Sequence, residues 1–190
     1  MQRVSVVGTS GSGKSTLGAA LAKRLGADFL ELDPVFHQPG WVPLPDEEFR
    51  RRVGEAVAGE RWVIDGNYSS KVRDLIWARA DTVVWLDLPK RIVMRRIIWR
   101  SVRRAARGTE LWNGNREHWR NLLSLDKEQS IIAWAWQTHA KNRAKFTAAL
   151  ADQENVELDV VRLKNPVDVR RFLRSVPAVP KSGAPASGGH

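Results

Sequence analysis

One segment near the N-terminus constrains the fold more than any other part of the sequence. Residues 8–15 read Gly-Thr-Ser-Gly-Ser-Gly-Lys-Ser and match the pattern G-x-x-x-x-G-K-[ST] at every fixed position. The segment follows a short β-branched run, residues 3–7, and precedes residues 14–24, whose leucines share one helical face. A strand, a glycine-rich turn and a helix in this order predict a loop whose backbone amides surround phosphate groups.

The residue types in this loop suit a nucleoside triphosphate bound with Mg²⁺. Glycine allows backbone angles that other residues resist, so successive N–H groups can point at phosphate oxygens. Lys14 can reach the β- and γ-phosphates, and the Ser15 hydroxyl can ligate Mg²⁺. The alternative is a glycine-rich turn that matches the pattern by chance. We predict that the nucleotide is bound by Gly8, Ser10, Gly11, Ser12, Gly13, Lys14, Ser15 and Thr16.

Runs typical of strands alternate with runs typical of helices along the rest of the chain. This alternation predicts a three-layer α/β domain, in which helices cover both faces of a five-stranded parallel sheet. The expected strands are residues 3–7, 28–32, 62–64, 82–88 and 158–163. The expected helices are residues 14–24, 46–58, 69–78, 89–106, 125–150 and 167–175, with a proline-rich loop at 33–45.

The predicted domain spans residues 1–176, and the composition beyond it changes. Residues 177–190 consist mainly of Pro, Gly, Ser and Ala, which predicts a disordered tail. Within the domain, the irregular segment after Gly108 separates two expected helices. We expect residues 107–120 to form a mobile helical lid that closes over the phosphates and excludes water.

Three acids lie at or just after the ends of predicted strands, where ligands bind in parallel sheets. Asp65 ends the apolar run of residues 62–64 and can hold Mg²⁺ with Ser15; the alternative is a cap on the turn at Gly66. Asp33 can orient an acceptor hydroxyl or take its proton, or it can simply start the turn with Pro34. Asp87 is expected to be structural, as a helix cap or a partner for a basic side chain.

Positive charge is concentrated in one block. Residues 90–120 contain ten Lys and Arg against two acids, so they account for eight of the ten net positive charges. At helical spacing the arginines form a stripe, opposite an apolar face. Such a stripe suits the charge that phosphoryl transfer spreads over phosphate oxygens. The alternative is a solvated basic surface. The stripe comprises Arg96, Arg100, Arg103 and Arg107.

Other function classes are constrained by composition. The nine tryptophans, several among arginines, could stack on single-stranded nucleic acid, but packing of Trp134 and Trp136 in the core or on the lid helix is the favoured interpretation. A regulatory GTPase is disfavoured because no Asn-Lys-x-Asp motif occurs. The absence of cysteine fits a cytoplasmic protein, and no apolar run is long enough to predict a membrane span.

These motifs resemble the P-loop kinases of the adenylate and shikimate kinase group. Within that group, Asp65-Gly66-Asn67-Tyr68-Ser69 and residues 110–115 are similar to the DNA topology modulation protein subfamily, which is related to adenylate kinase. The resemblance covers residues 3–175. It implies the α/β, three-layer P-loop NTPase fold with a five-stranded parallel sheet, and an acceptor region near residues 33–60. It also implies that Arg96 stacks near the adenine, that Arg100 contacts phosphate and that the loop at Asn165 lies beside the base.

One departure from adenylate kinases concerns the acceptor. Those enzymes follow Asp-Gly with Phe-Pro-Arg, whose arginine helps to hold the acceptor nucleotide, whereas this chain has Asn67-Tyr68-Ser69. We therefore predict an ATP- and Mg²⁺-dependent phosphotransferase acting on a nucleotide or a small hydroxylated metabolite. Its catalytic residues are Lys14, Asp33, Arg96 and Arg100. The alternative is a nucleotide-dependent nucleic-acid-binding protein with weak or no transferase activity.

Overall fold

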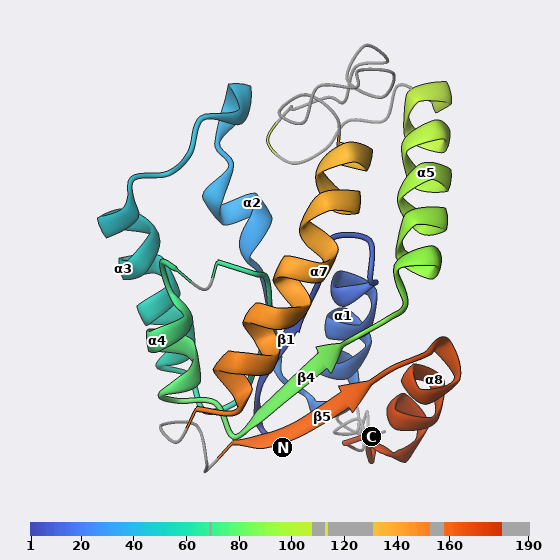
Figure 1. Cartoon of the computed structure of the whole chain (residues 1–190). Coiled ribbons are helices and arrows are strands. Elements are labelled where there is room, and N and C mark those ends of the chain that lie inside the picture. The colour runs from blue at the N-terminus through green and yellow to red at the C-terminus, as the bar shows by residue number, and fades with distance from the viewer. Residues whose placement is uncertain (69, 108–112, 114–130, 153–157, 180–190) are drawn as a thin grey trace, which may run out of the picture.

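A single sheet of five parallel strands forms the centre of the molecule (Figure 1). The computed structural model describes residues 1–68, 70–107, 113, 131–152 and 158–179. The strand order is β2-β3-β1-β4-β5, which confirms the predicted α/β P-loop NTPase architecture. The strands are β1 (Arg3–Gly8), β2 (Asp28–Glu31), β3 (Trp62–Asp65), β4 (Thr82–Leu86) and β5 (Asp159–Leu163).

Alternating side chains of β1 enter two separate cores. Val4 and Val6 belong to the core on one face, and Val7 belongs to the core on the other. Because β1 pairs with β3 and β4 in parallel register, the same alternation continues across the sheet. The apolar runs that predicted these strands are therefore buried on both sides.

Helices cover both faces of the sheet. α1 (Lys14–Leu25) and α8 (Pro166–Ser175) pack on the face of Val4. α3 (Asp46–Val57), α4 (Arg73–Trp77) and α7 (Ile131–Leu150) pack on the face of Val7. α5 (Lys90–Arg107) rises from the carboxyl end of β4, as Figure 1 shows. No helix in the described part of the chain combines the length and apolar character needed to cross a bilayer.

The prediction of a continuous loop at residues 33–45 is wrong. Residues Leu32–Phe36 form the short helix α2, and Pro39–Trp41 form a 3₁₀ turn. Pro34 is compatible with α2 because it lies in the first turn, where its missing N–H has no helical partner to lose. β2 and β4 also end earlier than expected, at Glu31 and Leu86, which leaves Asp33 and Asp87 beyond the strands.

α7 is held against the segment that links β4 to α5. Four of its side chains, three or four residues apart and therefore on one helical face, contact residues between Trp85, near the end of β4, and Lys90, the first residue of α5. The Phe146 and Trp85 ring centroids are 6.1 Å apart, and Arg143 Nε lies 3.0 Å from Asp87 Oδ1. One and two turns earlier in α7, His139 Nε2 lies 3.1 Å from the Leu88 carbonyl oxygen, and the Trp136 ring centroid lies 3.4 Å from Lys90 Nζ.

The expectations for the two tryptophans of α7 and for the predicted lid have different outcomes. Trp136 is not a core residue, because 57% of it is exposed and Lys90 covers its ring. The side chain of Trp134 and most of the predicted lid, residues 107–120, lie outside the described residues. Within the lid only Asn113 and the backbone of Arg107 are described.

The predicted tail begins with residues that contact α1. The Val179 N–H donates to the Arg24 carbonyl at 2.7 Å, and Arg24 Nη1 donates to the Val176 carbonyl at 2.9 Å. The start of the predicted tail is therefore bound to the domain, and residues 180–190 lie outside the described residues.

Candidate active site

The glycine-rich segment forms the predicted turn between β1 and α1. Gly11 and Gly13 have φ values of 78° and 97°, which lie in the left-handed region that glycine tolerates. α1 begins directly at Lys14, so the amides of the turn and of the first helical residues come together. A Cβ on Gly11 would lie only 2.4 Å from Ile97 Cγ1, so α5 packs closely against this loop.

Ser15 lies between two carboxylates at the carboxyl edge of the sheet. Its Oγ is 2.6 Å from Asp65 Oδ2 and 2.7 Å from Glu31 Oε1. One hydroxyl carries one proton, so it can donate to only one of these acceptors at a time. The arrangement brings the two predicted metal residues, Ser15 and Asp65, into direct contact and adds Glu31 to them.

Asp65 is buried beside these groups. Only 2% of it is exposed, and its Oδ1 has no hydrogen-bond partner among the described residues. Burial raises the pKa of Asp65 to about 6, although the nearby charge of Lys14 and the hydrogen bond from Ser15 lower it. The carboxylate is therefore desolvated and incompletely paired.

These oxygens fit a magnesium ion. No group of three or more His, Cys, Asp and Glu side chains in the described ranges is arranged to hold a metal. Mg²⁺ does not need one, because it usually takes one or two carboxylates and completes its octahedron with phosphate oxygens and water. The Ser15 hydroxyl, Asp65 and Glu31 would supply the protein oxygens, and the unpartnered Asp65 Oδ1 is the atom that a cation would satisfy.

Glu31 was not among the residues predicted from the sequence. It is the last residue of β2, and the parallel register places it directly opposite Asp65 on β3. The signal that could have found it is the one used for Asp65, an acid at the end of a strand. That signal becomes specific only when the pairing of β2 with β3 is known.

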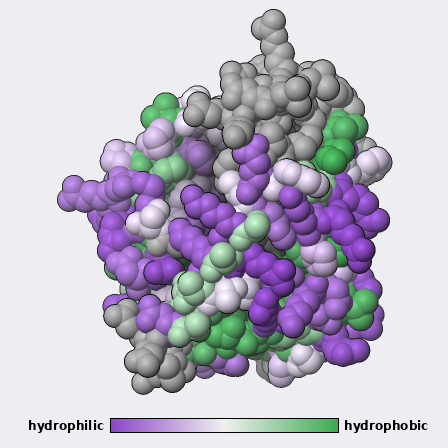
Figure 2. Space-filling model, in the orientation of Figure 1, coloured by the Kyte–Doolittle hydropathy of each residue, from purple (hydrophilic) through white to green (hydrophobic). Residues whose placement is uncertain are grey.

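The arginine stripe begins at the phosphate loop. Arg96 Nη1 donates to the Ser12 carbonyl at 2.6 Å and lies 3.2 Å from the position of a Cβ on Gly13. Arg100 is half-buried one turn further along α5, whereas Arg103 is exposed. The side chain of Arg107 lies outside the described residues. Hydrophilic side chains cover much of the face in Figure 2. α5 also exposes the apolar residues Ile98, Trp99 and Val102.

Asn67 connects the segment after β3 to the phosphate loop. Its Oδ1 accepts from the Gly8 N–H at 3.3 Å, and its Nδ2 donates to the Gly8 carbonyl oxygen. The sequence contains no signal for this contact, because an asparagine after Asp-Gly is equally typical of a surface turn.

Asp33 lies on α2, close to Tyr68. The Tyr68 hydroxyl donates to Asp33 Oδ1 at 2.8 Å, and the tyrosine ring packs against Phe36 and Phe49 at centroid distances of 4.7 and 5.2 Å. Asn113, from the predicted lid, donates to the carbonyls of Pro34 and His37 at 3.0 and 2.6 Å. Asp33 thus lies beside the aromatic cluster of Tyr68, Phe36 and Phe49, and a residue of the predicted lid contacts the end of α2.

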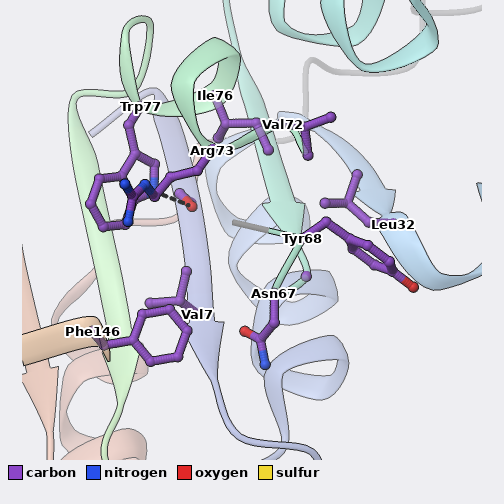
Figure 3. A pocket seen from close by; sticks show the side chains of 11 residues that line it. Val7, Leu32, Asn67, Tyr68, Val72, Arg73, Ile76, Trp77 and Phe146 are labelled. Atoms are coloured by element: carbon purple, nitrogen blue, oxygen red, sulfur yellow. Dashed lines mark hydrogen bonds between the residues drawn. The ribbon is translucent and has the colours of Figure 1, made fainter. Parts of the chain in front are cut away.

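A cavity behind Asn67 and Tyr68 is too small for a substrate. Its volume is about 20 Å³, room for roughly one water molecule. In Figure 3 the cavity is bounded by Val7 of β1, Phe146 of α7 and Trp77 of α4, whose Nε1 donates to Ser5 Oγ at 3.3 Å.

The remaining predicted residues are placed as follows. Thr16 is an exposed residue of α1, and Ser10 is partly exposed in the loop. Asn165 caps α8, because its Oδ1 accepts from the N–H groups of Val167 and Asp168, each at 2.9 Å. Its predicted place beside the base stays a prediction. Asp87 holds basic side chains, as one alternative expected, since Arg162 Nη2 and Arg143 Nε reach it at 2.6 and 3.0 Å.

Solved structures share this fold. A shikimate kinase from Acinetobacter baumannii, solved in complex with shikimate, aligns with a TM-score of 0.55 at 19% identity and covers 92% of this chain and 89% of its own. A gluconokinase from Sinorhizobium meliloti aligns with a TM-score of 0.51 at 19% identity, covering 91% and 87%. The fold is that of a P-loop kinase.

Sequence relatives point to the same class of enzyme. The chain is 26% identical over 192 residues to a shikimate kinase from Chlorobium luteolum, covering 94% of this chain and 90% of that protein. It is 33% identical over 105 residues to one from Synechococcus sp., which covers 48% of this chain and 54% of that protein. The predicted class, a kinase, is confirmed.

Two further comparisons bear on the subfamily. An uncharacterized protein of Bacillus subtilis, YqaC, is 27% identical over 136 residues, covering 70% of this chain and 71% of its own length. No family model matches the chain. The resemblance to the DNA topology modulation protein subfamily therefore stays a prediction.

Proposed function

We propose that this chain transfers the γ-phosphoryl group of ATP, bound with Mg²⁺, to a hydroxyl of a small metabolite. The observation that carries the proposal is the convergence of three groups on one loop. The glycine-rich turn offers its amides, Ser15 meets the carboxylates of Asp65 and Glu31, and Arg96 reaches the carbonyl of Ser12. The arginine stripe thus begins at the loop that would hold the phosphates, as a kinase needs.

The proposed step is a displacement at phosphorus. The acceptor hydroxyl oxygen forms a bond to the γ-phosphorus, the bond to the β–γ bridging oxygen breaks and ADP leaves, while the hydroxyl proton passes to Asp33. Lys14, Arg96 and Arg100 would stabilise the charge on the transferring oxygens. Bound Mg²⁺ would add charge neutralisation of the β- and γ-phosphates, held by Ser15, Asp65 and Glu31.

The charges of the acceptor region favour a hydroxylated metabolite over a nucleotide. An acceptor nucleotide needs cations for its own phosphate. Within residues 33–60 the arginines are paired: Arg50 with Asp74 at 2.6 Å, and Arg51 and Arg52 with Glu48 at 2.8 Å. Nearby, Lys71 pairs with Asp46 at 2.5 Å, and Arg73 lies over the Trp77 ring at 5.3 Å. The side chain that contacts Asp33 is aromatic, since Tyr68 donates to it and packs against Phe36 and Phe49. The relatives named as shikimate kinases and the gluconokinase fold are consistent with an acceptor of this kind.

The test is a screen for ADP release with MgATP and a panel of acceptors. The panel includes shikimate, gluconate, uncharged polyols and sugars, and nucleoside monophosphates. We expect ADP release to depend on a hydroxylated non-nucleotide compound and to stop when Mg²⁺ is chelated. Turnover with nucleoside monophosphates alone would overturn the choice of acceptor, and no acceptor-dependent turnover with any compound would overturn the proposed function.

A further inference from the structure

The proposed transfer uses Asp33 but leaves its neighbour Tyr68 unexplained. Tyr68 follows Asn67, whose side chain is hydrogen-bonded to the Gly8 backbone of the phosphate loop. The backbone of Tyr68 is also fixed on its other side, since its carbonyl accepts from the N–H groups of Lys71 and Val72 at 2.9 and 3.0 Å. Tyr68 therefore lies at a defined distance from the place where the triphosphate would bind.

The ring of Tyr68 is fixed by its neighbours. Phe36 and Phe49 pack against it at tilted and edge-on angles of 47° and 68°, and Phe49 is itself fully buried. Figure 3 shows the ring beside Leu32, with the hydroxyl directed away from the cavity at Trp77. The ring cannot turn without disturbing this packing, so the hydroxyl has a defined position.

The hydroxyl acts as a donor to Asp33. Its oxygen lies 2.8 Å from Asp33 Oδ1, and within the described ranges no hydrogen bond reaches Asp33 Oδ2. Burial, reinforced by the negative charge of Asp33, raises the pKa of Tyr68 above its ordinary value. The hydroxyl therefore keeps its proton at neutral pH, and the sense of this hydrogen bond is fixed.

On the basis of the function proposed above, we infer that Tyr68 is a positioning residue of the acceptor site. It holds Asp33 by one carboxylate oxygen, so that the other oxygen receives the proton of the attacking hydroxyl. Its ring forms one wall of the space that the acceptor enters. Correct orientation of a reacting group contributes strongly to rate, so loss of this single hydrogen bond is expected to slow transfer without weakening nucleotide binding.

A double-mutant cycle tests this inference with the best acceptor from the panel described above. Tyr68→Phe keeps the ring and removes only the hydroxyl. We expect kcat to fall about tenfold, with the KM for MgATP and the melting temperature nearly unchanged. Because Tyr68 acts through Asp33, Tyr68→Phe added to Asp33→Asn should lower kcat no further than Asp33→Asn alone.

The outcomes separate this inference from the proposed function. Wild-type turnover with equal kcat in Tyr68→Phe, or losses that multiply in the double variant, would overturn the positioning role and leave the kinase assignment intact. A parallel loss of kcat, nucleotide binding and thermal stability in Tyr68→Phe would make the residue merely structural. A wild-type chain without acceptor-dependent turnover would reject both.

A second measurement checks the contact without relying on activity. Tyr68 is the only tyrosine in the chain, so tyrosinate absorbance reports on it alone. The hydroxyl should lose its proton at a lower pH in Asp33→Asn than in the wild type, because the negative charge and the acceptor are removed. Identical titration curves for the two proteins would contradict the hydrogen bond on which the inference depends.

Discussion

Asp65 shows how one residue can disfavour folding and yet suit the site. Its carboxyl group is buried, with one oxygen in contact with Ser15 and the other without a hydrogen bond in the described part of the chain. A buried carboxylate with an unsatisfied oxygen destabilises the folded protein. The same oxygen is available to a cation, so a bound ion would relieve the penalty.

The pH dependence of stability should reveal this penalty. The folded-state pKa of Asp65 is raised from 3.8 to about 6, so the folded chain keeps a proton that the unfolded chain has lost. Stability without metal should therefore fall as the pH rises from about 4 to about 6. Asp65→Asn should raise the free energy of unfolding at pH 7 by up to roughly 3 kcal/mol, and the gain should vanish near pH 4.

Urea unfolding of both proteins at several pH values, with and without Mg²⁺, would measure this effect. Mg²⁺ should add to the stabilisation by ATP in the wild type and not in Asp65→Asn. A stability difference that is the same at pH 4 and pH 7 would contradict the assigned cause.

Lys14 is the side chain whose loss should affect chemistry most directly. Lys14→Ala removes the positive charge that would lie beside the transferring phosphoryl group, so kcat should fall on the order of a hundredfold or more. Lys23→Ala is a matched control, since Lys23 is exposed on the same helix. Initial rates of ADP release would measure both, and near-normal turnover of Lys14→Ala would count against the assignment.

At the scale of elements, α5 joins the phosphate loop to the predicted lid. Its buried side chains Val93, Met94 and Ile97 form a small core with Leu88, and Ile97 packs on Gly11. The face of α5 that carries Arg96 therefore begins beside the phosphate loop. α7 returns along the segment between β4 and α5, so the two helices that flank the predicted lid are both fixed near the carboxyl end of β4.

Two neighbouring arginines on α5 allow a direct contact with the phosphate loop to be distinguished from a general effect of positive charge. Arg96 donates to the Ser12 carbonyl, whereas Arg95 is exposed. Arg96→Gln should lower kcat/KM for MgATP by about tenfold or more, and Arg95→Gln should change it by less than about twofold. Equal losses from the two substitutions, in steady-state kinetics at matched ionic strength, would indicate only a long-range effect of charge.

At the scale of the whole molecule, the proposed ligand should stabilise the fold because its site joins several elements. The loop after β1, the ends of β2 and β3, and α5 all meet there, and only the folded chain brings them together. MgATP at a hundred times its Kd should raise the free energy of unfolding by about 2.7 kcal/mol. A rise in melting temperature with MgATP, reduced by chelation of Mg²⁺, would be the expected result, and no rise at saturating MgATP would argue against the site.

The local sequence determined the parts of this protein that depend on neighbouring residues. The phosphate loop, the apolar strands and the arginine stripe each follow from residue type and spacing within one segment, because backbone geometry repeats on that scale. The order of strands and helices was enough to predict the parallel sheet, since the connections between parallel strands follow few rules.

Only the tertiary structure decided which distant residues meet. Glu31 joins Asp65 through strand register, Asn67 reaches the Gly8 backbone, and Tyr68 donates to Asp33. Each of these contacts links segments that are far apart in the chain, and the local pattern around each residue is equally compatible with a surface position. Packing of the sheet and helices selects one partner among many, and a single sequence carries no local signal for that choice.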